Sequence, residues 1–175
     1  MKKKEFKPVS LKSIQKLFFR TQLVLIISLA LILGIAGSLI NLHYETEKRD
    51  QNLQNVAQTI ASSPLLTGKG LADDNASLTE YLDALKETLS DIDVISVVDA
   101  NGMRVYHSNP SLIGTQYDGN LPDFSNRNDD FYTVDENGPS GNQRRAYAAV
   151  YDRDGNYIGV VMAIMLMKNI HTETI

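Results

Sequence analysis

The strongest constraint on the fold is a run of twenty residues, 23–42, that contains neither a charged residue nor a proline. As an α-helix rising about 1.5 Å per residue, such a run covers about 30 Å, the thickness of a bilayer's hydrocarbon core. Its apolar residues occupy every face, whereas an amphipathic core helix has a polar face. The apolar region of a cleaved signal peptide is shorter, about 7–15 residues, and no cleavage-site pattern follows closely here. We therefore expect an uncleaved transmembrane helix over residues 21–42.

The charged residues are distributed unequally around this run. The net charge of -4 combines +6 in residues 1–20 with -10 in residues 21–175. Lys and Arg accumulate on the cytoplasmic side of membrane helices. We therefore expect residues 1–20 to form a cytoplasmic tail and the rest of the chain after the span to be extracytoplasmic. A basic tail can also bind nucleic acid, but beside a span the topological explanation is more direct, so we expect a membrane and no nucleic acid as partner.

The outer residues, 43–167, predict two helices followed by about five strands. Residues 43–63 carry an apolar stripe at helical spacing, residues 64–75 have loop composition, and a capping-box pattern opens a second helix over 77–89. The strands are expected at 93–99, 103–107, 131–134, 144–152 and 156–167, with hairpin turns at 101–102, 136–138 and 154–155. This order predicts an α+β domain whose antiparallel sheet has helices to one side.

The residue types that support catalysis or metal binding are sparse. The chain has no Cys and three His, and it lacks the short motifs of hydrolases, zinc proteases and phosphate-binding loops. Six acidic residues between 118 and 136 could form a calcium site, but a solvated loop is the simpler interpretation. Residues 152–155 begin like a calcium-binding loop, but its twelfth position is Ala163, so we expect a hairpin turn. We predict no catalytic residue, no metal site and no cofactor in these 175 residues.

Basic residues are few in the acidic outer domain, so their positions are informative. Arg104 and His107 lie at one expected strand, and Arg144 and Arg145 begin another. Arginine suits bidentate binding of carboxylates, which an acidic domain can bind only through local cations. The alternative is that these arginines pair with the many acidic residues of the surface.

The outer domain resembles the sensor domain of the histidine kinases that sense citrate and four-carbon dicarboxylates. The resemblance extends from the span to the end of the chain and rests on four segments in order. They are Arg104 to His107, Pro110 to Gly114 followed by Tyr117 to Gly119, Gly138 to Arg145, and Asp152 to Val161. It implies a PAS-like fold of the single Cache type, with a five-stranded antiparallel sheet and flanking helices.

The resemblance also implies a ligand site. In it, Arg104 and Arg145 would bind ligand carboxylates, and His107 would add a hydrogen bond or, when protonated, a charge. Tyr117 and Tyr147 fall at positions where the family has pocket residues. Two departures concern ligand identity: Pro139 replaces a frequent hydroxyl residue, for which Ser140 would have to compensate, and Ala149 replaces a frequent proline.

A geometric condition follows from the spacing of Arg104 and His107. In a regular strand, residues three apart point to opposite faces. The two side chains can therefore converge only if the strand ends or bulges near Tyr106.

The function implied is that of a membrane-anchored sensor module of a two-component kinase that binds a small di- or tricarboxylate. In the family, a second membrane span and a kinase core follow the sensor domain, and the kinase core is the part that contacts a response regulator. No such segment occurs here, so we expect residues 168–175 to start the connection to a missing second span, and we expect a homodimer. Two alternatives remain: the same fold serving a chemoreceptor or cyclic-nucleotide enzyme, and a bitopic structural protein without a ligand, whose Arg104 and Arg145 would point to solvent.

Overall fold

The structure is a computed structural model that describes residues 11–68, 71, 75–124 and 129–167. Contacts within the chain define two units, residues 1–47 and residues 48–175. Of the tail expected at residues 1–20, residues 1–10 lie outside the described residues, as does the connection expected at residues 168–175, whereas residues 11–20 belong to the first helix.

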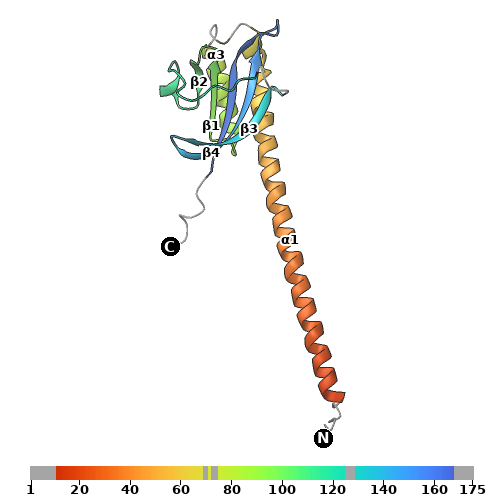
Figure 1. Ribbon diagram of the computed structural model, residues 1–175. Helices are drawn as coiled ribbons and strands as arrows, with labels where there is room; N and C mark the ends of the chain where they lie inside the picture. Colours follow the sequence, from red (N-terminus) through yellow and green to blue (C-terminus); the bar gives the residue numbers. More distant parts are fainter. Residues whose placement is uncertain (1–10, 69–70, 72–74, 125–128, 168–175) are drawn as a thin grey trace, which may run out of the picture. The chain divides into compact units, whose positions relative to one another are not determined.

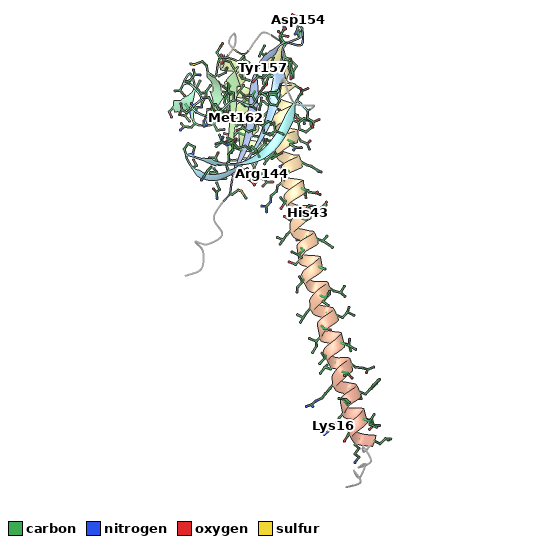
Figure 2. The ribbon with its side chains drawn as sticks, viewed as in Figure 1. Lys16, His43, Arg144, Asp154, Tyr157 and Met162 are labelled. Atoms are coloured by element: carbon green, nitrogen blue, oxygen red, sulfur yellow. The ribbon has the colours of Figure 1, made fainter. Side chains whose placement is uncertain are left out.

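The apolar run lies within helix α1 (Leu11–Ala61), which continues past it without interruption (Figure 1). Between Lys16 and His43 its large apolar side chains are exposed along the helix (Figure 2). The hydroxyl of Ser28 donates to the carbonyl of Leu25 at 2.9 Å, which satisfies this polar group inside its own helix. In the described part of the chain, α1 is the one helix long and apolar enough to cross a membrane.

The second unit is built on a five-stranded antiparallel sheet with the order β2-β1-β5-β4-β3 (Figure 1). The strands are β1 (Val94–Asp99), β2 (Arg104–His107), β3 (Phe131–Gly138), β4 (Gly141–Tyr151) and β5 (Tyr157–Leu166). Glycines with positive φ, Gly102 at 85° and Gly155 at 83°, lie in the two turns predicted from Asn-Gly and Asp-Gly. The predicted α+β arrangement of the sheet is confirmed.

Helices cover one face of this sheet. Leu53, Ala57 and Ile60 of α1 are fully buried there, together with Leu82 of α3 (Asn75–Thr88) and Leu66 of the short α2 (Pro64–Thr67). On the sheet, this face presents small or β-branched residues of β4 and β5: Ala146, Ala148, Val150, Val161 and Ala163. Small side chains allow the helices to approach the strands closely, so the apolar stripe predicted for residues 43–63 forms the main core.

The opposite face of the sheet carries a second apolar cluster. Tyr147 of β4 and Met162 of β5 are buried in it, and Phe124 packs over them from the long connection that follows β2. This connection begins with the 3-10 helix η1 (Pro110–Leu112). Helices thus cover one face, whereas a loop covers the other.

One predicted turn was wrong. Residues 136–138 were expected to form it, but β3 continues to Gly138 and β4 already begins at Gly141. The turn therefore consists of Pro139 and Ser140, where proline fixes its own φ and Gly141 follows with φ 97°. Because β3 extends beyond its predicted end, Asp135 lies directly opposite Arg144 on β4. These opposite charges stabilise the longer β3–β4 pairing.

Two helix boundaries also differ from the prediction. The expected loop at 64–75 contains the short helix α2, which Ser63 caps and which has Pro64 in its first turn. Helix α3 begins at Asn75, two residues before the expected capping box.

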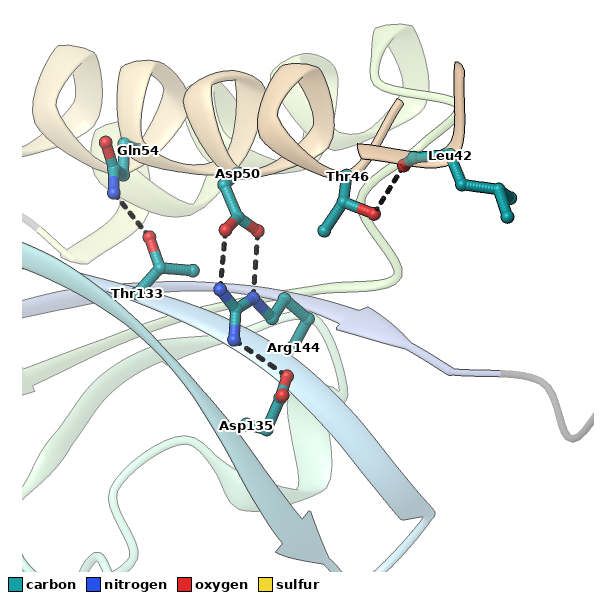
Figure 3. A network of polar contacts seen from close by, with 7 residues as sticks. All are labelled: Leu42, Thr46, Asp50, Gln54, Thr133, Asp135 and Arg144. Atoms are coloured by element: carbon teal, nitrogen blue, oxygen red, sulfur yellow. Dashed lines mark hydrogen bonds and ion pairs between the residues drawn. The ribbon is translucent and has the colours of Figure 1, made fainter. Parts of the chain in front are cut away.

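The end of α1 is held to the sheet by a network of charged side chains (Figure 3). Arg144 of β4 donates from Nε to Oδ1 of Asp50 at 2.8 Å and from Nη2 to Oδ2 at 2.5 Å. Its Nη1 lies 2.9 Å from the Asp135 carboxylate. Arg144 and Asp50 keep only 25% and 23% of their side-chain surface exposed, so this bidentate pair is partly shielded from water.

We predict that Asp50→Ala lowers the free energy of unfolding by about 1–3 kcal/mol, because Arg144 loses two charge-assisted hydrogen bonds in a partly shielded place. Chemical denaturation of the full chain in detergent, followed by circular dichroism, measures this loss. Asp135→Asn is the matched control and should have a smaller effect, because the Asp135 side chain is 66% exposed. Equal losses in the two variants would contradict the assigned role of Asp50.

Candidate functional site

A β-bulge brings Arg104 and His107 to the same face of the sheet. Tyr106 lies opposite Val97 and Arg104 lies opposite Val98, so Val105 is an extra residue in β2. Val105 and Tyr106 consequently both enter the core on the helix side. Arg104 and His107, opposite Val98 and Ser96, are left on the loop-covered face, which meets the condition set by the sequence.

The guanidinium of Arg104 is held by the connection that follows β2. It donates from Nη1 to the hydroxyl of Thr115 at 2.8 Å and to the carbonyl oxygen of Gln116 at 2.6 Å. Its central carbon lies 5.3 Å from the ring centroid of Tyr117. Backbone hydrogen bonds from Arg104 to Thr115 and from Gly114 to Arg104 fix this connection along the edge of β2. Arg104 is therefore positioned by neutral groups, and it forms no ion pair with the described residues.

Arg145 lies on the same face and is buried, with 8% of its surface exposed. Its Nε donates to Oε1 of Gln143 at 2.8 Å, and its Nη1 donates to the hydroxyl oxygens of Tyr117 at 3.2 Å and Tyr147 at 3.3 Å. The same Nη1 donates to the carboxylate of Glu136. Burial acts to lower the pKa of Arg145, but the hydrogen bond with Tyr147 and the nearby charges outweigh it, and the pKa is raised.

Tyr117 joins the two arginines. Its ring lies under the guanidinium of Arg104, and its hydroxyl oxygen accepts from Arg145. Tyr147 completes the group, because its hydroxyl donates to Oε1 of Glu136 at 3.0 Å and its ring stacks on Tyr132 at 5.1 Å. Burial raises the pKa of Tyr147, so its phenol stays protonated and remains a donor.

His107 presents one ring nitrogen to this face. Its Nδ1 accepts a hydrogen bond from the backbone N–H of Asn109 at 2.8 Å, and among the described residues Nε2 has no hydrogen-bond partner. Burial and the positive charge of Arg104 lower the pKa of His107. At neutral pH the imidazole is uncharged, so it offers a hydrogen bond rather than a cation.

Four of the six predicted site residues contact one another directly. They are Arg104, Tyr117, Arg145 and Tyr147. His107 lies on the same face, and its pKa responds to the charge of Arg104. Ser140 is different, because it is exposed in the turn between β3 and β4, at the end of the hairpin.

The sequence did not identify Glu136, whose carboxylate contacts both Arg145 and Tyr147. Residues 136–138 were expected to form a turn, which hid the fact that Glu136 and Arg145 share one face of a ladder. The Pro-Ser-Gly sequence at 139–141 is the signal that could have placed the turn correctly.

The alternative that the arginines pair with acidic residues also describes part of the structure. Arg144 pairs with Asp50 and Asp135 on the helix side, and Arg145 pairs with Glu136 on the loop side. Neighbouring residues of a strand point to opposite faces of the sheet, so the side chains of Arg144 and Arg145 lie in different environments. Asp135 and Glu136, which belong to the acidic stretch between 118 and 136, are therefore partners of arginines. Within the described residues, no three His, Asp or Glu side chains are grouped as a metal site would require.

Comparison with known proteins gives one curated relative of clear similarity. Over 120 residues, which are 69% of this chain, the sequence is 32% identical to the sensor histidine kinase CitA of Klebsiella pneumoniae. Among solved structures, the chain is similar to the sensor domain of DcuS from E. coli, with a TM-score of 0.53, 22% identity, and coverage of 68% of this chain and 89% of that one. The chain carries a sensor domain of the CitA and DcuS type.

The recognised family and the PAS-like, single Cache fold class are thereby confirmed. A further structural match is an extracellular ligand-binding receptor from Desulfohalobium retbaense, with a TM-score of 0.49, 20% identity, and coverage of 69% of this chain and 24% of that one. No family model matches the chain. The chain spans 21% of the length of the CitA kinase.

The lowered pKa of His107 predicts a dependence of stability on pH. Because the folded chain holds the proton of His107 less tightly than the unfolded chain, the unfolded state takes up more protons as the pH falls below about 6.5. Folding stability should therefore fall on acidification in that range, and it should fall less in His107→Gln. Thermal unfolding of both proteins at pH 7.5 and pH 5.5 gives the comparison, and identical losses would contradict the assignment.

Proposed function

We propose that this chain is the membrane-anchored, extracytoplasmic sensor of a two-component histidine kinase and that it binds a small di- or tricarboxylate of the citrate, malate or fumarate class. The observation that carries the proposal is the group of two arginines and two tyrosines on the loop-covered face of the sheet. Arg104 and Arg145 would each bind one carboxylate, with His107 adding a hydrogen bond from Nε2. Tyr117 and Tyr147 orient the guanidinium groups, and Ser140 would contact the ligand only if the turn folds over the site.

Electrostatics favours a site in which a few basic side chains, rather than the overall charge of the domain, bind the ligand. The outer part of the chain carries a net charge of -10 over residues 21–175, so its mean field repels anions. Arg145 is buried, where its charge acts through a lower effective dielectric and is screened less by salt. A dicarboxylate is favoured over a neutral ligand, because its carboxylates can form charge-assisted hydrogen bonds with the two guanidinium groups.

The output of the sensor is inferred from its relative. CitA is named a sensor histidine kinase, and this chain is similar to about a fifth of its length. We propose that the natural protein continues from β5 into a second span and a kinase core, which acts on a response regulator. We also propose that the sensor forms a homodimer.

The structural alternative is less well supported. A bitopic protein without a ligand would leave its arginines facing solvent, whereas only 8% of the surface of Arg145 is exposed. A chemoreceptor or cyclic-nucleotide enzyme would use the same outer domain with a different cytoplasmic output.

We predict that Arg104→Ala and Arg145→Ala each weaken the binding of malate or citrate by about tenfold or more, because each removes a charge-assisted hydrogen bond. Isothermal titration calorimetry on the full chain in detergent measures the affinity. Arg153→Ala, at an exposed position beside the β4–β5 turn, removes the same charge and serves as control, with unchanged affinity. Unchanged affinity in both site variants would refute the assignment of the site.

The orientation in the membrane can be tested directly, because the chain has no Cys of its own. Ser140→Cys should react with a membrane-impermeant maleimide in intact cells, because Ser140 is exposed in the outer domain. Ser10→Cys in the basic tail should react only after the membrane is permeabilised. The reverse pattern would refute the proposed cytoplasmic N-terminus.

A further inference from the structure

We propose that Glu136 is an internal competitor for the ligand: its carboxylate occupies Arg145 in the ligand-free sensor, and a dicarboxylate must displace it to bind. This inference rests on the proposed function and adds to it a residue that controls which ligands bind. It follows from the contacts of Glu136, from its position in the sheet and from the charge balance of the site.

The contacts of Glu136 are those that a ligand carboxylate would make. One carboxylate oxygen, Oε2, accepts from Nη1 of Arg145, and the other, Oε1, accepts from the hydroxyl of Tyr147 at 3.0 Å. Both oxygens are thus bound by groups of the proposed site. A carboxylate of a small ligand cannot use these donors while Glu136 holds them.

The position of Glu136 allows it to leave. Its side chain is 38% exposed, whereas that of Arg145 is 10% exposed. Glu136 lies on β3, which is an edge strand of the sheet, and near the turn formed by Pro139 and Ser140. A rotation of its side chain therefore carries the carboxylate into water, while the buried guanidinium of Arg145 stays in place.

The charge balance explains why the competitor affects ligands differently. With Glu136 docked, Arg145 is already neutralised, and Arg104 is the one arginine of the site that forms no ion pair with the described residues. While Glu136 is bound to Arg145, the site therefore has one arginine available, which suits a ligand with one carboxylate. A second carboxylate becomes favourable only after Glu136 has left, so the apparent affinity for dicarboxylates equals the intrinsic affinity multiplied by the fraction of molecules in which Glu136 is undocked.

The test uses malate and lactate, two 2-hydroxy acids that differ in one carboxylate, titrated into the full chain in detergent by calorimetry. Glu136→Gln removes the charge but keeps an acceptor for Arg145 and Tyr147. We expect malate to bind about tenfold more tightly or better, and lactate to change less than about threefold.

Asp135→Asn is the matched control for this test. Asp135 is the neighbouring residue of β3, carries the same charge, and faces Arg144 on the other side of the sheet. Its variant should leave malate affinity unchanged within about twofold. An equal gain in both variants would assign the effect to overall charge and overturn the proposal, as would a Glu136→Gln protein that binds malate no better than the wild type.

A second measurement tests the internal pair without any dicarboxylate. In Glu136→Ala, free acetate can take the place of the missing carboxylate beside Arg145. We expect acetate to raise the thermal unfolding temperature of this variant, but not that of the wild type or of the double variant with Arg145→Ala. Absence of this rescue would overturn the role of Glu136. Rescue by acetate without binding of malate or citrate to any variant would keep that role and refute the proposed ligand class.

Discussion

The alternation of side chains along β4 is the constraint on which the rest of the structure depends. Arg144 and Arg145 are consecutive, so one points to the helices and the other to the loop-covered face. Arg144 binds Asp50 of α1, eight residues after the apolar run ends, and Arg145 lies in the proposed ligand site. A shift of β4 by one residue would exchange the two environments and leave a buried arginine without its partners. The strand therefore links the proposed site to helix α1, which contains the apolar run.

The net negative charge of residues 43–167 is compatible with the proposed anion sensor, because the ligand would be attracted by individual arginines and not by the average electrostatic field of the domain. Asp50, Asp135 and Glu136 are bound to arginines, so they are partners of the cations rather than sources of free negative charge. Tyr117 and the carbonyl of Gln116 hold the guanidinium of Arg104 through a ring face and a neutral acceptor. In the proposed function, selectivity for anions would come from how the arginines are held, since their number is small.

Much of the fold could be predicted from the sequence because its signals are local. The twenty-residue apolar run, the stripe at Leu53, Val56 and Ile60, and the Asn-Gly and Asp-Gly turns each depend on neighbouring residues only. The convergence of Arg104 and His107 could be stated only as a condition, because the bulge at Val105 depends on the packing of two strands. Glu136 was missed for a similar reason: its partner Arg145 lies across a turn whose position was assigned three residues too early.

The central claim is that two arginines of this face bind the two carboxylates of one ligand. A crystal structure of the outer domain with malate tests it most directly. We expect one carboxylate on Arg104, the other on Arg145 beside Tyr147, and the side chain of Glu136 turned out to solvent. Malate bound elsewhere, with the Arg145–Glu136 pair intact, would contradict the account.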